Sequence, residues 1–286
     1  MLSLVSAYQD REHVYLLVEP CLGGELFGLK AEYEKGMPED LAKFYVASVT
    51  LAFQHIHALD YVYRDLKPEN ILIDAQGFAK VCDFGFAKKV VDRTYTLCGT
   101  PDYVPPEMLT GQGVNQAGDW WGLGVLAYEL VAVRPPFMDD DINKTFAKIK
   151  KAELKFPSRV TFSGSMRNLI KGFVTKNVAG RLGYQKGGAE DVVKHACFED
   201  FDFDGLVNKT LAPPWRPKLK KADDTSYFDQ EAMADCLEGH DLDAQEKLTA
   251  DEEEQWRPVF DQLGPYIKSS PDSPPGVNRS MLKEAL

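Results

Sequence analysis

The sequence lacks the cysteine pattern that disulfide-rich and zinc-binding proteins need. It has five cysteines in 286 residues, and no two of them stand at CxxC spacing. An odd number without close pairs predicts neither a disulfide framework nor a zinc site. Because free thiols persist in a reducing intracellular compartment, we expect a cytoplasmic protein that could also enter the nucleus.

Long apolar runs are also absent. The Met1–Tyr8 start has no basic region, and its apolar run is too short for a signal peptide. The most apolar later segment, Trp120–Val133, contains Tyr128 and Glu129 and is too short to cross a bilayer. The sequence therefore predicts no membrane span.

An excess of basic residues is missing as well. The net charge is −11, but 13 acidic residues and one lysine between Asp223 and Glu254 already contribute −12. The rest of the chain is therefore close to neutral, so a broad basic face for nucleic acid is not expected. The acidic segment itself is expected to be solvated and partly disordered.

Hydrophobic periodicity predicts a chain with short strands near its start and helices after them. One helix start is well marked, because Glu39 and Asp40 follow a proline and would lie at the positive end of the helix dipole. In chain order, the predicted elements are a strand at Val14–Val18, a helix from Pro38 to about Ala58, strands at Asn70–Asp74 and Ala79–Cys82 joined by a turn at Gln76-Gly77, and helices at Trp120–Val133, Asp141–Lys150 and Ser165–Thr175.

Two short motifs suggest the chemistry. The first is Tyr63-Arg64-Asp65-Leu66-Lys67-Pro68-Glu69-Asn70, and the second is Asp83-Phe84-Gly85. An acid, a base, an amide and an arginine within eight residues suit a loop that is held rigidly at an active site. Phosphoryl transfer needs such groups, since it asks a protein mainly for positioning and charge neutralisation.

Each residue type in these motifs has a role in that chemistry. Asp65 would accept the proton of an oriented serine or threonine hydroxyl, and Lys67 would place positive charge at the transferred phosphate. Asn70 and Asp83 offer the oxygen ligands that magnesium prefers. The spacing therefore predicts catalytic roles for Asp65, Lys67 and Asn70, and a magnesium site at Asn70 and Asp83.

Further runs have the order of a known family. Together with the two motifs, they make the chain similar to eukaryotic serine/threonine protein kinases of the AGC group, and within it to cyclic-nucleotide-dependent kinases. The similarity extends from about Tyr8 to Phe228, although Tyr63 stands where kinases usually carry histidine. The further runs are Leu22-Gly23-Gly24-Glu25-Leu26, Phe86-Ala87-Lys88-Lys89, Arg93-Thr94-Tyr95-Thr96-Leu97-Cys98-Gly99-Thr100-Pro101, Asp119-Trp120-Trp121-Gly122-Leu123-Gly124-Val125 and Arg134-Pro135-Pro136-Phe137.

The resemblance implies an α+β, protein-kinase-like fold that consists mainly of the helical large lobe. Residues 1–24 would form a remnant of the small-lobe sheet and the hinge, and residues 25–200 the large lobe. Residues 201–286 would form an AGC-type C-terminal extension that is acidic and partly disordered. In that extension, Trp256–Phe260 fits either a degraded terminal hydrophobic motif or an incidental aromatic pair.

The tail also contains a segment that resembles one found in AGC kinases. Asp223–Asp229 is similar to the stretch whose phenylalanine reaches the nucleotide pocket. Family members often carry an aromatic residue three positions later, where this chain has Glu231. The resemblance therefore leaves docking of the tail open.

By the same resemblance, the ligands would be ATP and Mg²⁺. Glu19 and Cys21 would bind adenine through the hinge backbone, and Leu72 would line the floor of its pocket. Thr96 stands where such kinases carry an activating phosphothreonine, with Arg64 and Lys88 as its cationic partners. The alternative for Thr96 is an unmodified loop threonine.

Three structural roles and one substrate site also follow from the resemblance. Glu107 would pair with Arg181, although Pro105 replaces the usual alanine and is expected to perturb the backbone locally. Asp119 would brace the catalytic loop from behind. The substrate site would hold arginines that precede the phosphorylated residue, and its members are Glu25, Glu69 and Glu129.

A kinase also uses a glycine-rich loop over the phosphates and a strand lysine paired with a helix glutamate. No such motif precedes the strand near Tyr8 in these 286 residues. Three explanations stay open: an incomplete piece of an active kinase, a short form that binds partners without efficient catalysis, and a chain that borrows the absent part. We favour the first, because an abandoned enzyme would be expected to lose Asp65 or Asp83 early.

We therefore expect an ATP- and magnesium-dependent serine/threonine kinase of the AGC class that acts on basic protein substrates. The alternative is a non-catalytic pseudokinase or scaffold that binds partners through the large lobe. No cyclic-nucleotide-binding domain is recognisable in the sequence, so a regulatory subunit would act in trans.

Overall fold

The computed structural model describes residues 1–9 and 14–231, which form two compact units. The first unit consists of Met1 together with Gly23–Lys218. The second consists of Leu2–Leu22 together with residues 219–231. The structure thus divides the chain after residues 22 and 218, whereas the sequence predicts boundaries after residues 24 and 200.

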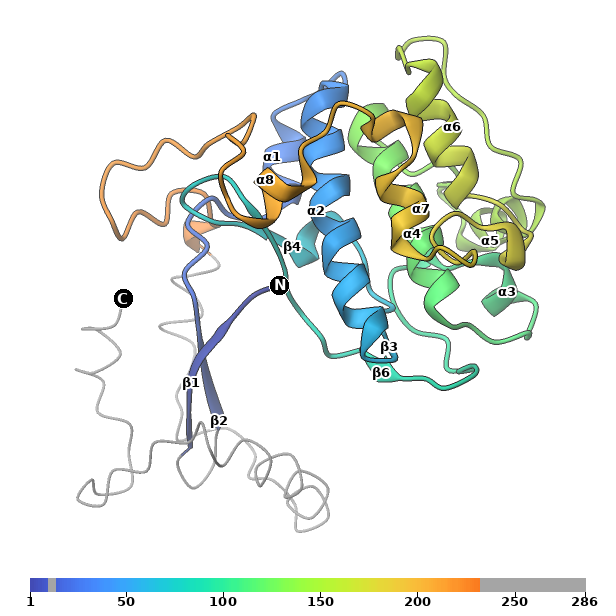
Figure 1. Cartoon of the computed structure of the whole chain (residues 1–286), viewed down its shortest axis with the longest axis horizontal. Helices are drawn as coiled ribbons and strands as arrows, with labels where there is room; N and C mark the ends of the chain where they lie inside the picture. The colour runs from blue at the N-terminus through green and yellow to red at the C-terminus, as the bar shows by residue number, and fades with distance from the viewer. Residues whose placement is uncertain (10–13, 232–286) are drawn as a thin grey trace. The chain divides into compact units, whose positions relative to one another are not determined.

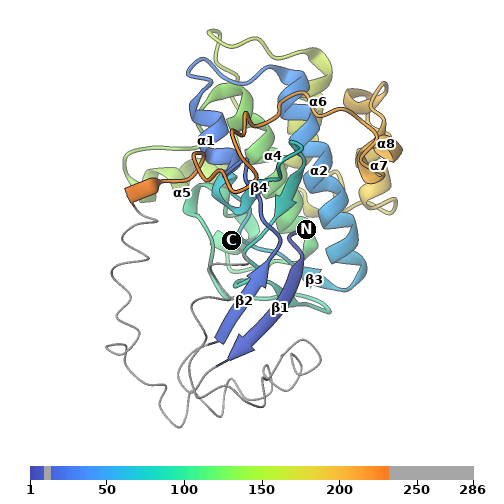
Figure 2. The ribbon, with the colours of Figure 1, turned by 90° about the vertical axis from the view of Figure 1, so that its left-hand side faces the viewer.

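Helices make up most of the first unit (Figure 1, Figure 2). Its α-helices are α1 (Leu26–Ala31), α2 (Glu39–Ala58), α3 (Pro106–Leu109), α4 (Gln116–Ala132), α5 (Ile142–Lys151), α6 (Gly164–Phe173), α7 (Ala189–Val193) and α8 (Phe203–Val207). Its 3₁₀ helices are η1 (Pro68–Asn70), η2 (Pro101–Tyr103), η3 (Val178–Gly180) and η4 (Ala196–Phe198). Its strands are β3 (Tyr61–Val62), β4 (Ile71–Ile73), β5 (Ala79–Val81) and β6 (Lys88–Lys89).

Helix α2 forms where the sequence predicts it. Pro38 occupies the N-cap position, and Glu39 and Asp40 lie in the first turn, next to the positive end of the helix dipole. The helix ends at Ala58, and its buried residues are apolar except for Thr50. This apolar face lets α2 pack against α4 in the interior of the unit.

Helix α4 lies at the centre of the first unit. Every residue from Ala117 to Ala132 is buried, as expected for a helix that is apolar on all sides. The helix begins before the predicted start at Trp120, because the Asn115 side chain accepts a hydrogen bond from the backbone N–H of Ala117 at 3.1 Å and caps it. Helix α6 comes so close that a Cβ on Gly124 would lie 2.5 Å from the Cβ of Phe173, so this position requires glycine.

A short hairpin connects the two sequence motifs. Tyr63–Asn70 directly precedes its first strand, and Asp83-Phe84-Gly85 follows its second strand. Strands β4 and β5 are antiparallel, with Ile71 opposite Val81. Both are shorter than predicted: Asn70 belongs to η1, and the Asp74 carboxylate accepts the backbone N–H groups of Gln76 and Phe78 in the turn at 3.0 and 2.9 Å. The hairpin brings the ends of its strands together, since the backbone N–H of Cys82 donates to the carbonyl of Asn70 at 3.0 Å.

The second unit contains one antiparallel strand pair, formed by β1 (Leu4–Gln9) and β2 (Val14–Val18). The sequence predicts β2 with these bounds, whereas for the residues of β1 it predicts only a remnant of the small-lobe sheet within residues 1–24. In residues 219–231, the Asp224 carboxylate accepts the backbone N–H groups of Lys220 at 2.7 Å and Ser226 at 3.0 Å. These hydrogen bonds, that from Lys220 first, lower the pKa of Asp224 to about 2.

This architecture confirms the predicted α+β class with a dominant helical part. Within residues 1–9 and 14–231, no helix combines the length and apolar character that crossing a membrane requires. The four described cysteines, Cys21, Cys82, Cys98 and Cys197, are free thiols. Most of the acidic segment and all of Trp256–Phe260 lie outside the described residues.

Candidate active site

The loop between β3 and η1 is braced from behind by Asp119, a buried residue of α4. One oxygen of its carboxylate accepts the backbone N–H of Tyr63 at 2.8 Å, and the other accepts that of Arg64 at 2.9 Å. The ring nitrogen Nε2 of His57, on α2, lies 2.7 Å from the first oxygen. Arg64 has a φ of 71°, which is unfavourable for a residue with a side chain, so the brace also stabilises a strained backbone.

The carboxylate of Asp65 is held on both of its oxygens. Oδ2 accepts a hydrogen bond from Asn70 Nδ2 at 2.9 Å and lies 3.3 Å from Lys67 Nζ. Oδ1 accepts a hydrogen bond from the Thr100 hydroxyl at 3.3 Å. The Asp65 residue is 3% exposed. A carboxylate that is fixed in this way can take the proton of a hydroxyl group brought to its remaining lone pair.

Asn70 and Asp83 form the side of the site that suits a cation. Asn70 Nδ2 donates to both the carbonyl and the carboxylate of Asp65, which fixes the amide group in place. Asp83 directly follows Cys82, whose backbone N–H bonds to the Asn70 carbonyl. Asp83 is exposed, and its Oδ1 accepts the backbone N–H of Gly85 at 3.1 Å.

This donor set fits a hard divalent ion that shares its remaining ligands with phosphate and water. Amide and carboxylate oxygens are the ligands that magnesium prefers. Magnesium is usually bound through one or two carboxylates and substrate phosphates, not in a cage made only of protein. In agreement, the described residues hold no group of three or more His, Cys, Asp or Glu side chains that could enclose a metal alone.

The residue that departs from the usual kinase histidine, Tyr63, connects the two motifs. Its side chain is buried, and its hydroxyl donates to the backbone carbonyl of Cys82. Its ring meets that of Phe84 edge to face, with 5.4 Å between the ring centres. Phe84 therefore has a packing partner in the first unit, although it remains 39% exposed.

The segment 88–100 lies directly on residues 63–70, the predicted catalytic loop. Gly99 has a φ of +87°, and a Cβ there would come 2.4 Å from the backbone carbonyl oxygen of Arg64, so glycine is required. Thr94 anchors the middle of the segment, since its backbone N–H and carbonyl both bond to Val114, at 2.9 and 2.8 Å. Between these two anchors Thr96 is exposed.

Two cations near this segment have few partners. The Nη1 atom of Arg64 is buried and has no hydrogen-bond partner among the described residues, while Nε donates to the Phe86 carbonyl at 2.7 Å. Lys88 Nζ has one weak contact, with the Thr94 hydroxyl at 3.4 Å. Because buried polar groups are nearly always paired, the unpaired nitrogen of Arg64 marks an unfilled acceptor position.

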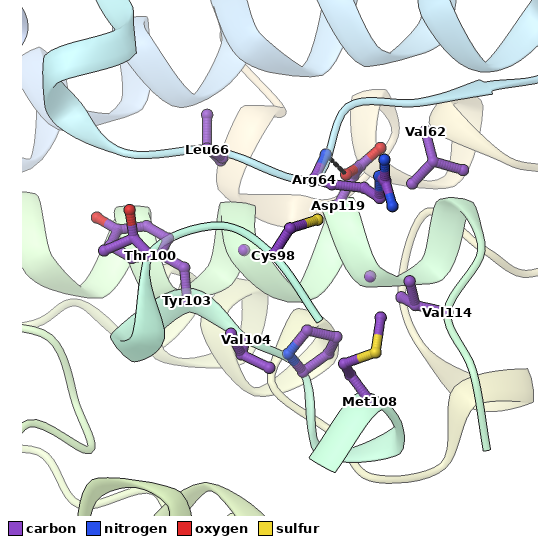
Figure 3. A pocket seen from close by; sticks show the side chains of 13 residues that line it. Val62, Arg64, Leu66, Cys98, Thr100, Tyr103, Val104, Met108, Val114 and Asp119 are labelled. Carbon is purple, nitrogen blue, oxygen red and sulfur yellow. Dashed lines mark hydrogen bonds between the residues drawn. The ribbon is translucent and has the colours of Figure 1, made fainter. Parts of the chain in front are cut away.

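A small cavity of about 30 Å³ lies between the catalytic loop and the segment (Figure 3). Arg64 and Asp119 line it together with Cys98 of the segment. Burial raises the pKa of the Cys98 thiol, and the Arg64 charge opposes that rise. The thiol of Cys82, also half-buried, has its pKa raised to about 11, mainly by burial.

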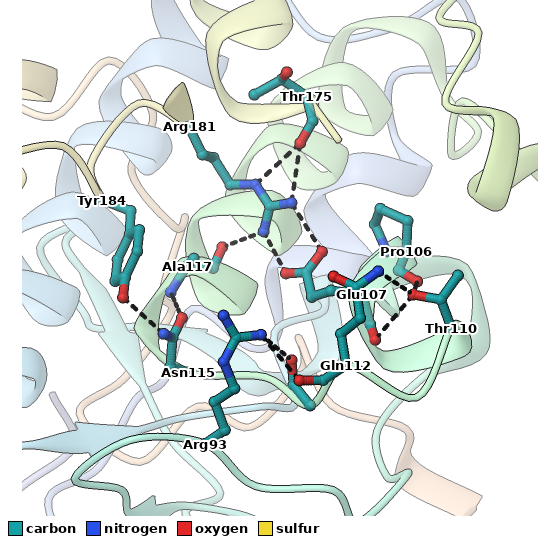
Figure 4. A network of polar contacts seen from close by, with 11 residues as sticks. Arg93, Pro106, Glu107, Thr110, Gln112, Asn115, Ala117, Thr175, Arg181 and Tyr184 are labelled. Carbon is teal, nitrogen blue, oxygen red and sulfur yellow. Dashed lines mark hydrogen bonds and ion pairs between the residues drawn. The ribbon is translucent and has the colours of Figure 1, made fainter. Parts of the chain in front are cut away.

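The chain that follows the segment is anchored in α3 by a buried ion pair (Figure 4). Arg181 is fully buried and forms a two-pronged contact with Glu107, at 2.6 and 2.9 Å. The guanidinium also donates to the carbonyl oxygens of Ala117 at 2.8 Å and Thr175 at 2.9 Å. The pair is present although Pro105 replaces the alanine of the family motif; Pro105 caps the short helix α3, in which Glu107 lies.

The three glutamates assigned to substrate binding lie in different surroundings. Glu25 precedes α1 and is partly buried, and Glu69 of η1 is exposed. Burial, followed by the charge of Glu69, raises the pKa of Glu25. Glu129 is buried at the end of α4, where Lys30 and the Tyr103 hydroxyl contact its carboxylate.

The residues assigned to adenine binding fall in both units. Leu72 lies in β4 of the first unit and pairs its backbone with Glu25. Glu19 and Cys21 belong to the second unit, where the Glu19 backbone N–H donates to the Ser3 carbonyl at 3.0 Å. Their contribution to a nucleotide site remains a prediction.

Sequence reasoning did not single out several residues that complete the site. Thr100 bonds to Asp65, and His57 bonds to Asp119. Lys30 and Tyr103 hold Glu129. Thr100 lies within the Arg93–Pro101 run that carries the resemblance, so its position was a usable signal. Tyr103, His57 and Lys30 lie outside the runs that carry it.

Comparison with known proteins identifies the family. Residues 1–198 match the family model described as the protein kinase domain. The chain is 42% identical over 240 residues to cAMP-dependent protein kinase type 3 of Saccharomyces cerevisiae, covering 80% of this chain and 60% of that protein. It is 40% identical over 229 residues to the cAMP-dependent protein kinase catalytic subunit PRKX of Homo sapiens, covering 80% and 63%.

A third relative is cGMP-dependent protein kinase, isozyme 2 forms cD5/T2, of Drosophila melanogaster. The identity is 42% over 234 residues, covering 80% of this chain and 25% of that protein. The chain thus spans less than two thirds of each of these relatives. These matches confirm the predicted similarity to cyclic-nucleotide-dependent kinases and the predicted protein-kinase-like fold.

Proposed function

This chain belongs to the protein kinase family, and we propose that it transfers phosphate from ATP to serine or threonine hydroxyls of basic protein substrates. The observation that carries the proposal is the arrangement around Asp65, a buried carboxylate held on both oxygens beside a lysine and an amide. A general base needs a carboxylate fixed in this way.

Asp65 and Lys67 would act on the transferred group from two sides. The Asp65 carboxylate would accept the proton of the substrate hydroxyl, which makes that oxygen a better nucleophile. The Lys67 ammonium lies 3.3 Å from Asp65 and would place positive charge next to the phosphate. Thr100 would keep the carboxylate oriented through its 3.3 Å hydrogen bond.

Nucleotide and metal would be held at the neighbouring positions. Asn70 and Asp83 would bind Mg²⁺, which neutralises negative charge on the phosphates when it is bound. Leu72 would contact adenine. The exposed Asp83 carboxylate and the fixed Asn70 amide support this assignment.

Phosphorylation of Thr96 would complete the segment 88–100. The hydroxyl is exposed, and the segment lacks an anion for the unpaired Arg64 Nη1. A phosphate adds about two negative charges and three acceptor oxygens, and it pairs well with arginine. Lys88, whose own contact is weak, would add a second cation.

Two classes of partner follow from the proposal. Substrates would carry basic residues before the phosphorylated hydroxyl, which Glu25, Glu69 and Glu129 would bind; Glu25 and Glu69 are close enough for the charge of Glu69 to raise the pKa of Glu25, after the larger effect of burial. Some relatives are named as cAMP- or cGMP-dependent. We propose that control of that kind comes from a regulatory subunit in trans.

A transfer assay tests the proposal. The full chain is incubated with Mg²⁺, labelled ATP and an arginine-rich serine peptide, beside Asp65→Asn and Asp140→Asn variants. Asp140 is an exposed aspartate outside the site and serves as the matched control. Loss of the general base should lower the rate about 100-fold or more, and the Asp140 change should not alter it. Equal background rates in all three proteins would contradict the enzyme and favour the scaffold.

A further inference from the structure

A second cavity lies where α2, α4 and α7 meet. Its volume is about 420 Å³, and small-molecule sites usually occupy about 300–1,000 Å³. Its walls come from α2, α4, α7 and the loop of residues 183–188 before α7, all within the first unit. None of the residues to which we assign ATP, magnesium or substrate lines it. The cavity is therefore a candidate site for a separate small molecule.

The loop of residues 183–188 is held close against α4. Gly183 has a φ of +83°, and a Cβ there would lie 2.3 Å from the ring of Trp120, so this position requires glycine. The hydroxyl of Tyr184 accepts a hydrogen bond from Asn115 Nδ2 at 2.7 Å. These contacts fix one wall of the cavity, as is usual for small-molecule sites, which are largely preformed.

Polar groups without partners line the cavity. Trp120 is 1% exposed, and its indole N–H has no hydrogen-bond partner among the described residues. His57 Nε2 lies 2.7 Å from the Asp119 carboxylate, so Nε2 carries the proton and Nδ1 of the neutral ring is an acceptor. In the described part of the chain this Nδ1 also has no partner. Because buried polar groups are nearly always paired, the cavity offers a donor and an acceptor to a bound molecule.

The charge of the cavity restricts the kind of molecule. Its described lining residues include one acid, Glu190, and no lysine or arginine. Glu190 is exposed and already paired with Lys194 at 3.5 Å. An anion would therefore lose its hydration without gaining a positive partner. A neutral carboxamide fits better, because its carbonyl accepts a hydrogen bond and its amino group donates others.

Asp119 connects the cavity to the catalytic loop. Its Oδ2 accepts the backbone N–H of Tyr63 at 2.8 Å and lies 2.7 Å from His57 Nε2, so the two groups share one oxygen. Phe53 stacks on the His57 ring with 5.3 Å between the ring centres, and Trp120 meets that ring edge to face at 5.4 Å. A molecule bound to Nδ1 would hold the ring in the orientation that supports Asp119.

We propose that this cavity is an allosteric site for a small, neutral, planar molecule that carries a carboxamide group. The carbonyl oxygen of the ligand accepts the Trp120 N–H, and its amino group donates to His57 Nδ1. Binding stabilises the hold of Asp119 on the backbone of Tyr63 and Arg64, since a ligand shifts an equilibrium toward the state that it binds better. Such a site would regulate the proposed kinase activity, but its existence does not depend on phosphate transfer.

Nuclear magnetic resonance with two matched probes tests the site. Nicotinamide carries a carboxamide on a planar ring, and nicotinate has the same ring with a carboxylate in its place. Both are titrated against the isotope-labelled full chain, following the indole N–H signal of Trp120, which is assigned by its loss in Trp120→Phe. Nicotinamide should shift this signal with a dissociation constant in the millimolar range, as suits so small a ligand. Nicotinate should bind about tenfold more weakly or worse.

Filling the cavity provides a matched pair of variants. Ala58 is exposed at the end of α2 and lines the cavity, so Ala58→Phe places a ring at its edge. Ala147 is exposed on α5 and does not line it. Ala58→Phe should weaken nicotinamide binding about tenfold or more, whereas Ala147→Phe should leave it unchanged. Thermal unfolding checks that both variants fold, and Ala189→Phe of α7, which also lines the cavity, replaces Ala58→Phe if that variant does not.

Exchange of backbone amide hydrogens tests the link to the loop. Saturating nicotinamide should slow exchange at Tyr63 and Arg64 about fivefold or more in the unaltered chain and not in Ala58→Phe. Absence of binding, equal binding of nicotinate, or full binding to Ala58→Phe would overturn the site. Binding that leaves exchange at Tyr63 and Arg64 unchanged would overturn its allosteric role. Since no step uses ATP, a chain that transfers no phosphate can still support the site, and the two proposals fail separately.

Discussion

The catalytic loop and the segment 88–100 lie against each other but differ in how complete they are. Asp65 and Asp119, which define the loop, have every carboxylate oxygen engaged by groups of the protein itself. In the segment Thr96 is exposed, and the loop itself has one open position, since the buried Nη1 of Arg64 has no partner among the described residues. The two carboxylates of the loop are thus already fixed, whereas we propose that the segment receives a negative charge through a phosphate on Thr96.

The largest expected effect concerns the buried ion pair between Glu107 and Arg181, which anchors the chain after the segment. Glu107→Gln leaves the fully buried Arg181 charge uncompensated, so the free energy of unfolding should fall by about 3–5 kcal/mol. Chemical denaturation measures this change. The matched control is Glu190→Gln, which breaks an exposed pair with Lys194 and should change stability by less than about 1 kcal/mol. Equal losses of unfolding free energy in the two variants would show that the Glu107–Arg181 pair does not anchor this part of the chain.

The next effect concerns the brace of the loop. Asp119→Asn removes the negative charge that receives the backbone N–H groups of Tyr63 and Arg64, and it should lower the free energy of unfolding by about 1–3 kcal/mol. Activity should fall further than this loss of stability explains, because the strained Arg64 backbone is released next to Asp65. Denaturation and transfer assays on the same protein separate the two effects. Unchanged activity would show that the loop holds its shape without Asp119.

The third prediction concerns the segment 88–100. A phosphate on Thr96 should pair with Arg64 and raise the transfer rate about tenfold or more, if its charge-assisted hydrogen bonds favour the ordered segment. Preparations with and without the phosphate are compared, and Arg64→Met should abolish the difference. A phosphate effect that survives in Arg64→Met would show that another cation receives it.

The smallest effect concerns the link between the two motifs. Tyr63→Phe keeps the ring that packs on Phe84 but removes the hydroxyl that donates to the Cys82 carbonyl. Stability should fall by about 1 kcal/mol, as for one buried hydrogen bond. Tyr63→Leu removes the ring as well and should cost more. If the two variants are equally stable, the contact with Phe84 contributes nothing measurable.

Local sequence signals predicted the elements that are determined locally. The Pro38 start and apolar spacing of α2 gave both of its ends correctly, and the turn at Gln76-Gly77 placed the hairpin. Strand β1 was not predicted, because its residues carry no strong alternation and its partner β2 follows later in the chain. The start of α4 was placed too late, since the cap at Asn115 was not considered.

The residues of the site also fall into two groups, those that a local motif predicts and those that only the packing of distant segments brings together. Asp65, Lys67 and Asn70 stand within one motif, so their meeting in space follows from one short loop. Lys30 and Glu129 are 99 positions apart, and their ion pair depends on how α1 and α4 pack. Such contacts between distant segments leave no periodic or motif signal in the sequence. Only the packed structure brings them together.

Hydrogen exchange of the backbone amides tests the central contrast most directly. The chain is compared with and without phosphate on Thr96, following residues 63–70 of the loop and 88–100 of the segment. We expect slow exchange across 63–70 in both states, and slow exchange across 88–100 only in the phosphorylated one. Fast exchange of the loop before phosphorylation, or equal protection of the segment in both states, would contradict a preformed loop beside an incomplete segment.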